Sequence, residues 1–473
     1  MNTDNRFAIP PEEAEKQKEY TRLASALIDA RFTGKPLAYV HTYGCQGNVA
    51  DGERLKGTLE EIGYGFTDDL EKADLVLYNT CAIREHAEDR VFGNVGALKN
   101  LKQRKKEMRI LLCGCMMQQP RVTQKIRKSY SFVDIIFGTH VMHRLPEFIY
   151  KSLSSGKKIC DISGEEGVIP EDMPVHRDSD FKAWLPIMYG CNNFCSYCIV
   201  PYVKGRERSR DPQLIIKEAK ELVAAGYKEI TLLGQNVNSY GKAPDYGYNF
   251  PRLLRELNDI EGDFIIRFMT SHPKDCTHEL LDTMAECDKV AKHLHLPFQS
   301  GCDRVLKEMN RGYTAEKYLS LLEYAYKVMP DLSVTADVIV GFPGETYEEF
   351  LQTVDLVKKA GFTSMFTFIF SSREGTKASK MPDPIPAEEK SKWFRELLDA
   401  QEEVAAQRTA SSAGKTYRVL CEGVSKGGLI EGRTEGNIII EFPADEAVIG
   451  SFRYVTVTES LTWILRGRMV DNK

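Results

Sequence analysis

The run Cys191-Asn192-Asn193-Phe194-Cys195-Ser196-Tyr197-Cys198 places three cysteines at a Cys-x3-Cys-x2-Cys spacing. Thiolates that close together on one loop can hold three irons of a 4Fe–4S cluster, because soft sulfur ligands suit such clusters. The next downstream cysteine is Cys276, so the fourth iron would stay open for a substrate. The alternatives are a zinc knuckle, which needs four closed ligands, and buried thiols. The spacing favours the cluster.

The composition is that of an ordinary globular protein, and 473 residues suffice for about two to four domains. The net charge of −5 gives no global basic signature, so any nucleic-acid contact has to come from local patches. We find no secretory signal and no apolar run of transmembrane length, and therefore expect a cytoplasmic protein without membrane contact. Twelve cysteines in such a chain indicate metal or redox ligands rather than disulfides.

Residues 1–35 form an N-terminal arm, for which the polar helical pattern of residues 12–30 predicts a solvated helix. Residues 36–154 alternate short apolar strands with charged helical stretches, which predicts a doubly wound parallel sheet. The expected strands are residues 37–41, 75–79, 109–113 and 133–137.

Three cysteines follow successive strands of this predicted sheet, namely Cys45, Cys81 and Cys115. Sites in such sheets form beyond the carboxyl ends of the strands, so these cysteines predict a second metal site. Cys113 competes with Cys115, but it is the last residue of its strand, where a small buried hydrophobe is common. Position therefore favours Cys115. The basic run of residues 99–109 fits phosphate contact and a solvated helix face equally well.

Residues 155–176 are a linker rich in Ser, Gly and acidic residues. Residues 177–407 form a second α/β unit with six expected strands, which fits a partial (β/α)6 barrel with ligands at the carboxyl ends of its strands. The expected strands are residues 185–188, 229–233, 264–269, 293–296, 334–340 and 365–370. The polar residues and glycine that follow or end these strands are candidate ligand contacts, namely Gln235, Asn236, Ser271, Asp337 and Gly341.

Two further features of this region have competing interpretations. His295 is more typical of a satisfied strand histidine than of a ligand. The basic loop that follows the three cysteines could bind phosphate or a carboxylate, or could simply be solvated. Its cations are Lys204, Arg206, Arg208 and Arg210.

Residues 410–473 change character and predict a small all-β barrel. The expected strands are residues 416–422, 437–442, 452–458 and 461–465, with turns at Gly427-Gly428 and Glu435-Gly436. Either an RNA-binding barrel or a stabilising cap fits this pattern.

Several longer motifs extend the pattern beyond the cysteines. They are His-Thr-Tyr-Gly-Cys-Gln from 41, Asn-Thr-Cys-Ala-Ile-Arg-Glu from 79, Gly-Cys-Met-Met-Gln from 114, Gly-Cys-Asn-Asn-Phe-Cys-Ser-Tyr-Cys from 190, Leu-Gly-Gln-Asn-Val-Asn-Ser-Tyr from 233, His-Leu-Pro-Phe-Gln-Ser-Gly from 295 and Val-Gly-Phe-Pro-Gly-Glu-Thr from 340. With these motifs, residues 36–473 resemble the radical S-adenosylmethionine (SAM) methylthiotransferases, and within them the tRNA-2-methylthio-N(6)-dimethylallyladenosine synthases. The N-terminal arm lies outside this resemblance.

The resemblance implies two 4Fe–4S clusters and SAM as cofactors. Cys191, Cys195 and Cys198 would hold the SAM-cleaving cluster, and an auxiliary cluster that handles sulfur would be held by Cys45, Cys81 and Cys115. The family's Gly-Cys-x-x-Gln pattern selects Cys115 over Cys113. The SAM contacts would be Tyr197, which would pack on the adenine, together with Gln235, Asn236, Ser271, Asp337 and Gly341. No catalytic side chain is assigned.

The implied reaction places a methylthio group on C2 of N(6)-dimethylallyladenosine beside the tRNA anticodon. The implied partners are tRNA, bound in part by a TRAM-like C-terminal barrel, and an electron donor such as flavodoxin or ferredoxin; we expect a monomer. Sister enzymes that methylthiolate a ribosomal-protein aspartate or threonylcarbamoyladenosine in tRNA are the first alternative. The second is a non-enzymatic RNA-binding protein with structural metal, which would not cleave SAM.

Overall fold

The structure is a computed structural model that describes residues 7–82, 85–164, 167–171, 173–242 and 247–471. It divides into two compact units, which we describe separately. The first comprises residues 1–178, 188–192 and 198–210, and the second comprises residues 179–187, 193–197 and 211–473. Among the helices in the described ranges, none combines the length and the apolar character needed to cross a bilayer.

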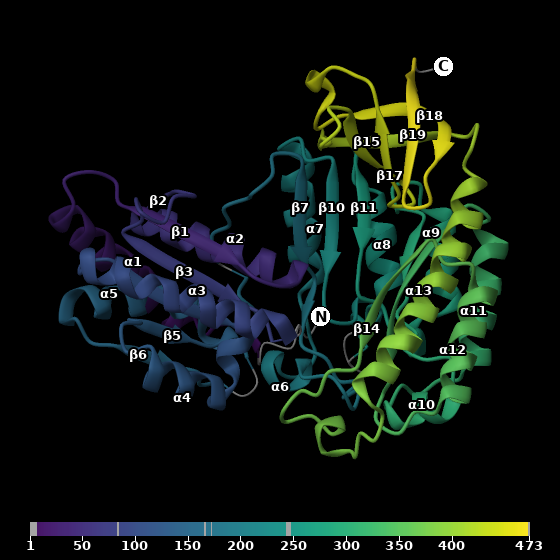
Figure 1. Cartoon of the computed structure of the whole chain (residues 1–473). Helices are drawn as coiled ribbons and strands as arrows, with labels where there is room; N and C mark the ends of the chain where they lie inside the picture. The colour runs from purple at the N-terminus through teal and green to yellow at the C-terminus, as the bar shows by residue number, and fades with distance from the viewer. Residues whose placement is uncertain (1–6, 83–84, 165–166, 172, 243–246, 472–473) are drawn as a thin grey trace. The chain divides into compact units, whose positions relative to one another are not determined.

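The described part of the first unit contains one parallel six-stranded sheet with the order β2-β1-β3-β4-β5-β6 (Figure 1). This confirms the predicted parallel sheet, but β2 and β6 were not predicted because they are too short to show a pattern. Strand β6 lies in the stretch expected to be a linker, and its Cys160 pairs with Ile136 of β5. The strands are β1 (Leu37–Thr42), β2 (Gly65–Phe66), β3 (Leu75–Thr80), β4 (Arg109–Gly114), β5 (Ile135–Phe137) and β6 (Ile159–Asp161).

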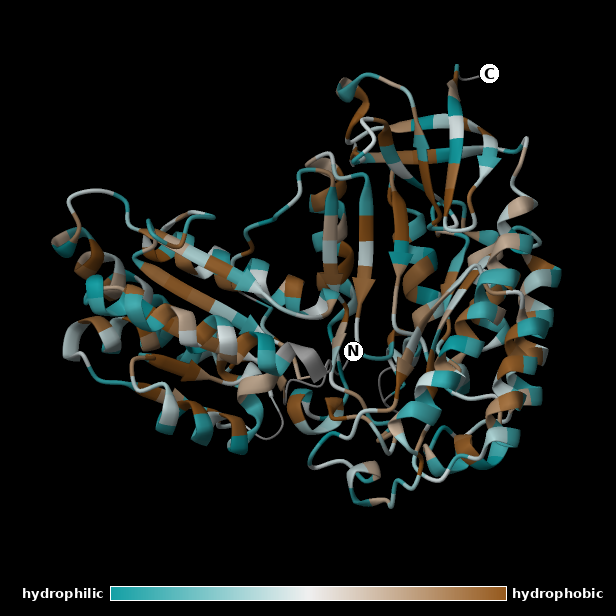
Figure 2. Cartoon of the chain, viewed as in Figure 1, coloured by the Kyte–Doolittle hydropathy of each residue, from teal (hydrophilic) through white to brown (hydrophobic). Residues whose placement is uncertain are grey.

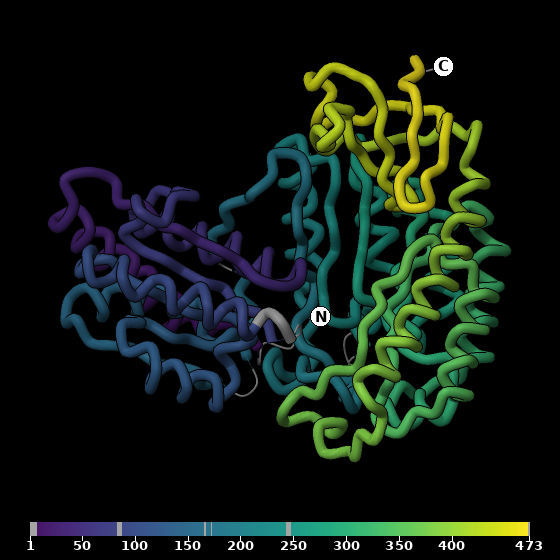
Figure 3. Tube along the Cα trace, viewed as in Figure 1, coloured from purple at the N-terminus to yellow at the C-terminus, as the bar shows by residue number. Residues whose placement is uncertain are grey.

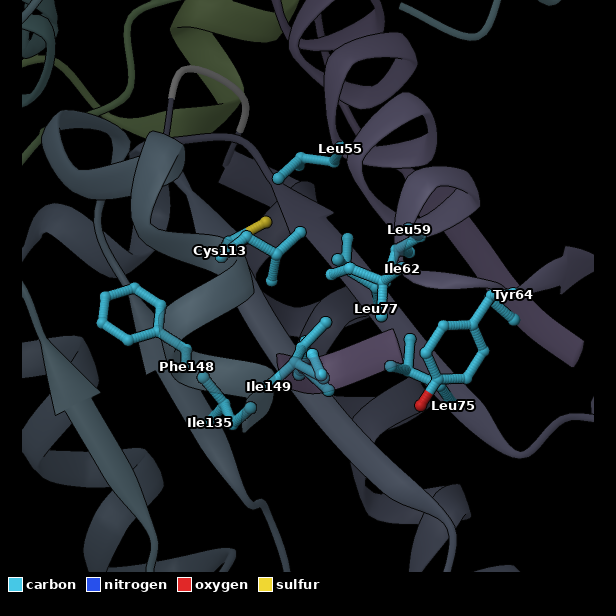
Figure 4. Close-up of a cluster of buried hydrophobic side chains, with 14 of the residues drawn as sticks. Leu55, Leu59, Ile62, Tyr64, Leu75, Leu77, Cys113, Ile135, Phe148 and Ile149 are labelled. Carbon is cyan, nitrogen blue, oxygen red and sulfur yellow. The ribbon is translucent and has the colours of Figure 1, made fainter. Parts of the chain in front are cut away.

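Helices cover both faces of this sheet because successive strand residues point to opposite sides. Leu75 and Leu77 of β3 enter one core, which Figure 4 shows, and Val76 and Tyr78 enter the other. The first core is closed by α1 (Pro11–Arg31), α2 (Gln46–Ile62) and α5 (Leu145–Ser155), and the second by α3 (Glu85–Arg104) and α4 (Pro120–Ser129). The sheet is therefore doubly wound, as predicted.

Helix α1 corrects one expectation. Ala24 and Ile28 are buried in the first core, and Gln17 donates a hydrogen bond from Nε2 to Glu147 Oε2 at 3.3 Å. The helix therefore packs on α5 and is not a solvated arm. Its apolar residues are few and small, which is why the sequence pattern is so weak.

The second unit holds six parallel strands within its described residues, in the orders β11-β10-β7 and β12-β13-β14. A bridge between Ile266 and Val290 links the two sets. Figure 2 shows the strands as largely apolar and the helices as mixtures of polar and apolar residues. This is the predicted partial (β/α)6 barrel. Its strands are β7 (Lys182–Pro186), β10 (Glu229–Leu233), β11 (Ile265–Phe268), β12 (His293–His295), β13 (Ser333–Val340) and β14 (Ser364–Ile369).

Figure 3 traces how the chain returns to an outer helical layer between these strands. The helices of this layer begin at favourable residues, for example Thr346, which forms a capping box with Glu349 at the start of α12. The helices are α7 (Pro212–Ala224), α8 (Phe250–Asn258), α9 (His278–Glu286), α10 (Asp303–Glu308), α11 (Ala315–Val328), α12 (Tyr347–Ala360) and α13 (Ala387–Ala410).

The last strands close into the predicted small barrel, in the order β15-β16-β17-β19-β18. Arg267 of β11 ties this barrel to the strands of the second unit. Its guanidinium pairs with Glu229 at 2.7 Å and donates to the carbonyl oxygens of Thr434 and Glu435 at 2.8 and 2.9 Å. Strand β16 was not predicted. The strands are β15 (Thr416–Val424), β16 (Ile430–Thr434), β17 (Ile439–Phe442), β18 (Phe452–Ser460) and β19 (Ile464–Val470).

Candidate metal centres and cofactor site

The sheet of the first unit brings Cys45, Cys81 and Cys115 to one edge. Each lies just past the carboxyl end of one of three adjacent strands: Cys45 after β1, Cys81 after β3 and Cys115 after β4. Asn48 is the buried residue that joins these segments. Its Nδ2 donates to the carbonyl oxygens of Tyr43 and Thr80 at 3.0 and 2.9 Å, and the Cys115 thiol lies 3.5 Å from its Oδ1.

The thiols of this group differ in their protonation. A hydrogen bond with the Cys81 side chain lowers the pKa of Cys45 to about 6, against the opposing effect of burial. Burial raises the pKa of Cys115 to about 11, although the charge of Lys204 opposes it. A thiolate is the form that binds metal, and the lowered pKa of Cys45 favours that form.

A buried ion pair completes this site. Lys204, at the end of α6 (Val200–Lys204), lies 2.6 Å from Asp51 Oδ2, and both side chains are less than one-tenth exposed. Burial lowers the pKa of Lys204, but Asp51 and Cys115 more than offset this, so its pKa is raised and the ammonium keeps its charge. A cation near Cys45 and Cys115 fits a site that accumulates negative charge when thiolates gather.

Cys113 lies elsewhere. Alternation along β4 turns its side chain into the apolar core that Figure 4 shows, together with Leu75 and Leu77. Burial raises the pKa of this thiol well above its ordinary value. Its environment is mainly that of a core residue, whereas Cys115, although it packs against Ile199 and Val203, also lies beside Asn48 and Lys204.

The loop that carries the other three cysteines contributes residues to both compact units. Cys191 and Cys195 are buried and Cys198 is partly buried. The Cys191 amide donates to the Gly205 carbonyl at 3.2 Å, and Phe194 adopts a left-handed φ of 47°. In the second unit, the Ser196 amide donates to the Met309 carbonyl at 3.0 Å and the Ser196 carbonyl accepts from the Ala378 amide at 2.7 Å, which fixes the middle of the loop.

Arg311 approaches this loop from the second unit. Its buried guanidinium donates from Nη1 to Cys195 Sγ at 3.3 Å and to the Tyr197 hydroxyl at 3.4 Å. Further bonds to the Pro297 carbonyl at 2.7 Å and the Tyr313 hydroxyl at 3.1 Å hold the side chain in place. The sequence analysis did not identify Arg311, because it lies far from the cysteines in the chain and no spacing rule connects them.

These donors fit iron–sulfur clusters. Among the described residues, no three Cys, His, Asp or Glu side chains converge on a single metal ion. A 4Fe–4S cluster does not require such convergence, because each thiolate ligates a different iron. Two sets of three cysteines, with Lys204 or Arg311 directed at a sulfur, match this chemistry.

Orphaned polar atoms lie at the carboxyl ends of β10 and β11. Within the described residues, Asn236 Oδ1 and Ser271 Oγ are buried and have no hydrogen-bond partner. The Nδ2 of Asn236 is held by Asp275 Oδ2 at 2.6 Å, so the amide oxygen has a fixed direction. Buried polar atoms normally have partners, so these two fit a polar ligand. Gln235 beside them is partly exposed.

The remaining candidate contacts lie on β13, at its end and on the cysteine loop. Asp337 and Tyr197 are partly exposed, as ligand-facing residues have to be. Gly341 has a φ of +71°, and the Glu345 carboxylate accepts hydrogen bonds from the Gly341 and Phe342 amides at 2.7 and 3.1 Å, which closes this loop tightly.

Other sequence features have structural roles. His295 contacts Thr335 Oγ1 through Nδ1 at 2.9 Å and Asp337 through Nε2 at 3.5 Å, so it is the satisfied strand histidine that we expected. In the basic run, Lys102 pairs with Asp134 at 2.8 Å and Arg104 pairs with Glu71 at 2.7 Å.

Most cations of the basic loop after the cysteines are buried in contacts within the protein, so they are neither solvated nor available to bind phosphate. Lys204 pairs with Asp51, Arg208 is buried and donates to the Lys204 carbonyl at 3.2 Å, and Arg210 is buried against Glu171. Only Arg206 is exposed among the four cations of this loop. The residues Ile83 and Arg84 of the motif from 79 lie outside the described residues.

Comparison with known proteins agrees with this geometry. Residues 37–138 match the uncharacterized protein family UPF0004, residues 185–357 the Radical SAM superfamily and residues 410–470 the TRAM domain. A solved radical S-adenosylmethionine methyltransferase, TsrM from Kitasatospora setae, shares the fold with a TM-score of 0.53 and 15% identity over 73% of this chain and 77% of that chain. The fold and the Cys-x3-Cys-x2-Cys loop thus define a radical SAM enzyme.

Relatives named tRNA-2-methylthio-N(6)-dimethylallyladenosine synthase extend over the whole chain. The one from Thermoanaerobacter sp. is 47% identical over 98% of both chains, and the one from Alkaliphilus oremlandii is 46% identical over 100% of both. This protein belongs to the family of tRNA-2-methylthio-N(6)-dimethylallyladenosine synthases, and it is a transferase whose family membership implies SAM and 4Fe–4S clusters as cofactors. The N-terminal arm, expected to lie outside the resemblance, falls within these alignments.

Proposed function

We propose that this protein transfers a methylthio group to C2 of N(6)-dimethylallyladenosine next to the anticodon of tRNA. The observation that carries the proposal is the gathering of Cys45, Cys81 and Cys115 at one sheet edge, in a chain related to these synthases over at least 98% of its length. A SAM-cleaving loop alone would fit many reactions. Cys45, Cys81 and Cys115 would hold an auxiliary cluster at which sulfur can be methylated and transferred.

In this proposal Cys191, Cys195 and Cys198 hold the SAM-cleaving cluster, and Cys45, Cys81 and Cys115 hold the auxiliary cluster. When bound, these clusters and SAM supply the electron, the radical chemistry and the sulfur. The protein supplies charge and position: Lys204 sits beside the auxiliary cysteines and Arg311 beside Cys195.

The SAM site is proposed to use the orphaned oxygens of Asn236 and Ser271. Polar groups of SAM would satisfy these buried atoms. Gly341, where the Lys390 side chain fills the space beside the backbone, would contribute to the site only through the tight turn at the end of β13. Tyr197 would pack on the adenine, and its hydroxyl is already oriented by Arg311. Gln235 and Asp337 complete the proposed set.

The C-terminal barrel is proposed to bind the tRNA. RNA loops are commonly read through splayed bases that stack on aromatic side chains. Tyr454 and Trp463 of the barrel are 39% and 43% exposed, which suits such stacking. A tRNA substrate also agrees with a cytoplasmic protein, and we propose a monomer that takes electrons from a donor such as flavodoxin or ferredoxin.

The proposed function also assigns a role to each part of the chain. We propose residues 36–154 as the auxiliary-cluster domain, 177–407 as the radical SAM core and 410–473 as the RNA-binding barrel. The segments expected to be an N-terminal arm (1–35) and a linker (155–176) contribute α1 and β6 to the first of these domains. Each of the three families matched lies within one of these domains.

One experiment separates this function from its sister reactions. The reconstituted full-length enzyme, reduced and anaerobic with SAM, is offered an anticodon stem-loop with dimethylallyladenosine, one with threonylcarbamoyladenosine, and the ribosomal protein with its target aspartate. We expect a methylthio product from the first alone. A product from either of the others, with none from the first, would contradict the proposal. Absence of 5′-deoxyadenosine with every substrate would favour the non-enzymatic alternative.

A further inference from the structure

Strand β13 presents two different faces. Val334, Ala336 and Val338 are fully buried on one face, whereas Thr335, Asp337 and Ile339 are only partly buried on the other. Successive strand residues point to opposite sides, so the partly buried residues form the face that packing covers less completely.

Strand β14 continues this open face. The register pairs Asp337 with Phe366 and Ile339 with Phe368, so these side chains share one side of the sheet. The opposite side of β14 packs on α13, because Gln401 donates to the Met365 carbonyl at 2.9 Å and accepts from Thr367 at 3.0 Å. Phe366 and Phe368 therefore point away from α13.

Two phenylalanines on this face are unusually exposed. Phe366 is 53% exposed and Phe368 45% exposed, although their strand belongs to the core of the second unit. We call Phe366, Phe368 and Ile339 the aromatic strip. The Phe366 ring is held edge-on to the His295 ring, with 6.0 Å between centroids. Exposed apolar side chains that are fixed side by side commonly mark a binding surface.

The aromatic strip leads toward the cysteine loop. Ile339 packs in the same apolar cluster as Tyr197, next to Cys302 and Phe342. All of these residues belong to the second unit. A ligand on the strip would therefore lie on the strand face that runs to Tyr197, which is where a substrate of the cysteine loop has to be bound.

We propose that the aromatic strip binds the dimethylallyl chain of the substrate adenine, an inference that rests on the proposed function. The chain is a branched, neutral hydrocarbon, which phenylalanine rings bury favourably. Asp337 lies beside Phe366 and carries a carboxylate on the same face. Asp337 would repel the carboxylate of a threonylcarbamoyl group or of an aspartate, so this neighbour of the aromatic strip would select against the two sister substrates.

Equilibrium binding to the full-length reconstituted enzyme tests this without requiring turnover. The probes are two anticodon stem-loops that differ only in carrying dimethylallyladenosine or adenosine at the target position. We expect the wild type to bind the dimethylallyl RNA about 10 to 100 times more tightly. Phe366→Ala and Phe368→Ala should each reduce this preference about 10-fold, whereas Phe368→Leu should keep most of it.

Leu214→Ala on α7 is the matched control, because Leu214 is 43% exposed but lies on an outer helix. It should leave the preference unchanged, and thermal melting should show that all variants are folded. An unchanged preference in both alanine variants, or a wild type without preference, would overturn the inference. If the strip carries the preference but the wild type forms no methylthio product, the binding site stands and the proposed reaction fails.

Discussion

Arg311 Nη1 donates a hydrogen bond to Cys195 Sγ across 3.3 Å, inside a buried environment that also includes Tyr197. The two residues are 116 positions apart in the chain, so only the tertiary fold brings a cation to this sulfur. Hydrogen bonds and charge at cluster sulfurs set reduction potentials, because reduction adds negative charge. We therefore expect Arg311 to influence the reduction potential of the cluster proposed at Cys191, Cys195 and Cys198.

Replacing Arg311 should make the proposed SAM-cleaving cluster at Cys191, Cys195 and Cys198 harder to reduce. We expect Arg311→Met to lower its reduction potential by roughly 50 mV, as the loss of one charge-assisted hydrogen bond suggests. Arg311→Lys should recover part of the difference. Redox titration followed by electron paramagnetic resonance measures this. The exposed Arg252, which pairs with Glu256 on α8, gives the control Arg252→Met. Equal potentials in wild type and Arg311→Met would show that Arg311 has no influence on the cluster.

Cys113 and Cys115 form a matched pair two residues apart on the chain. Cys115→Ala should remove about half of the bound iron and all methylthio product, while SAM cleavage to 5′-deoxyadenosine continues. Cys113→Ala removes only a core side chain and should cost about 1 kcal/mol of stability with the iron content unchanged. Iron analysis and product assays compare the two variants. Loss of iron in Cys113→Ala, but not in Cys115→Ala, would contradict the prediction and identify Cys113 as the cluster ligand.

The buried pair of Lys204 and Asp51 should show strong coupling. Lys204→Met leaves the Asp51 carboxylate buried without its cation, which should destabilise the surrounding structure by about 3–5 kcal/mol. Asp51→Asn added to Lys204→Met should recover much of this loss. Hydrogen exchange of the α2 amides in the cluster-free protein provides the measurement. Additive effects of the two substitutions would mean that the pair does not interact.

Glu147 should make the docking of α1 sensitive to acid. Burial would raise its pKa, but hydrogen bonds from Arg144, Lys151 and Gln17 lower it to about 2. A lowered carboxyl pKa stabilises the folded state above its ordinary value of 4.5, and this contribution is lost as the pH falls toward 2. We expect ionised Glu147 to stabilise the folded state by roughly 2 kcal/mol at neutral pH, after discounting for the solvent that reaches Lys151.

Limited proteolysis of α1 between pH 7 and pH 3 checks this expectation. The wild type should become more susceptible at the acid end, and Glu147→Gln should be more susceptible at neutral pH with little further change. Glu12→Gln, at an exposed position of the same helix, is the control. The same pH profile in wild type and Glu147→Gln would exclude Glu147 as the cause.

The sequence indicates both cysteine sets as candidate ligands, for two different reasons, and their roles stay predictions. Cys191, Cys195 and Cys198 are close in the chain, so spacing alone identifies them. Cys45 and Cys81 are far apart, but each follows a strand of an alternating α/β pattern, and parallel strands bring their carboxyl ends together. The long strands and helices were also predicted, because burial on a regular period leaves a visible pattern.

What the sequence did not reveal depends on tertiary contacts. Strand β2 has only two residues, and the buried positions of β16 include Gly432 and Thr434, so neither strand shows an apolar pattern. Helix α1 buries so few residues that it looked solvated. Arg208 and Arg210 looked like a basic surface, yet the fold buries them against carbonyl and carboxylate oxygens. The exposure of Phe366 could not be predicted, because an apolar strand residue is more often buried.

Mass spectrometry of tRNA nucleosides tests the central claim most directly. A host that lacks its own activity is compared with and without this gene, and with Cys198→Ala and Cys115→Ala. We predict that methylthio-dimethylallyladenosine forms with the wild-type gene and disappears in both variants. If the dimethylallyl nucleoside stays unmodified while the expressed protein carries its iron, the assigned substrate is wrong.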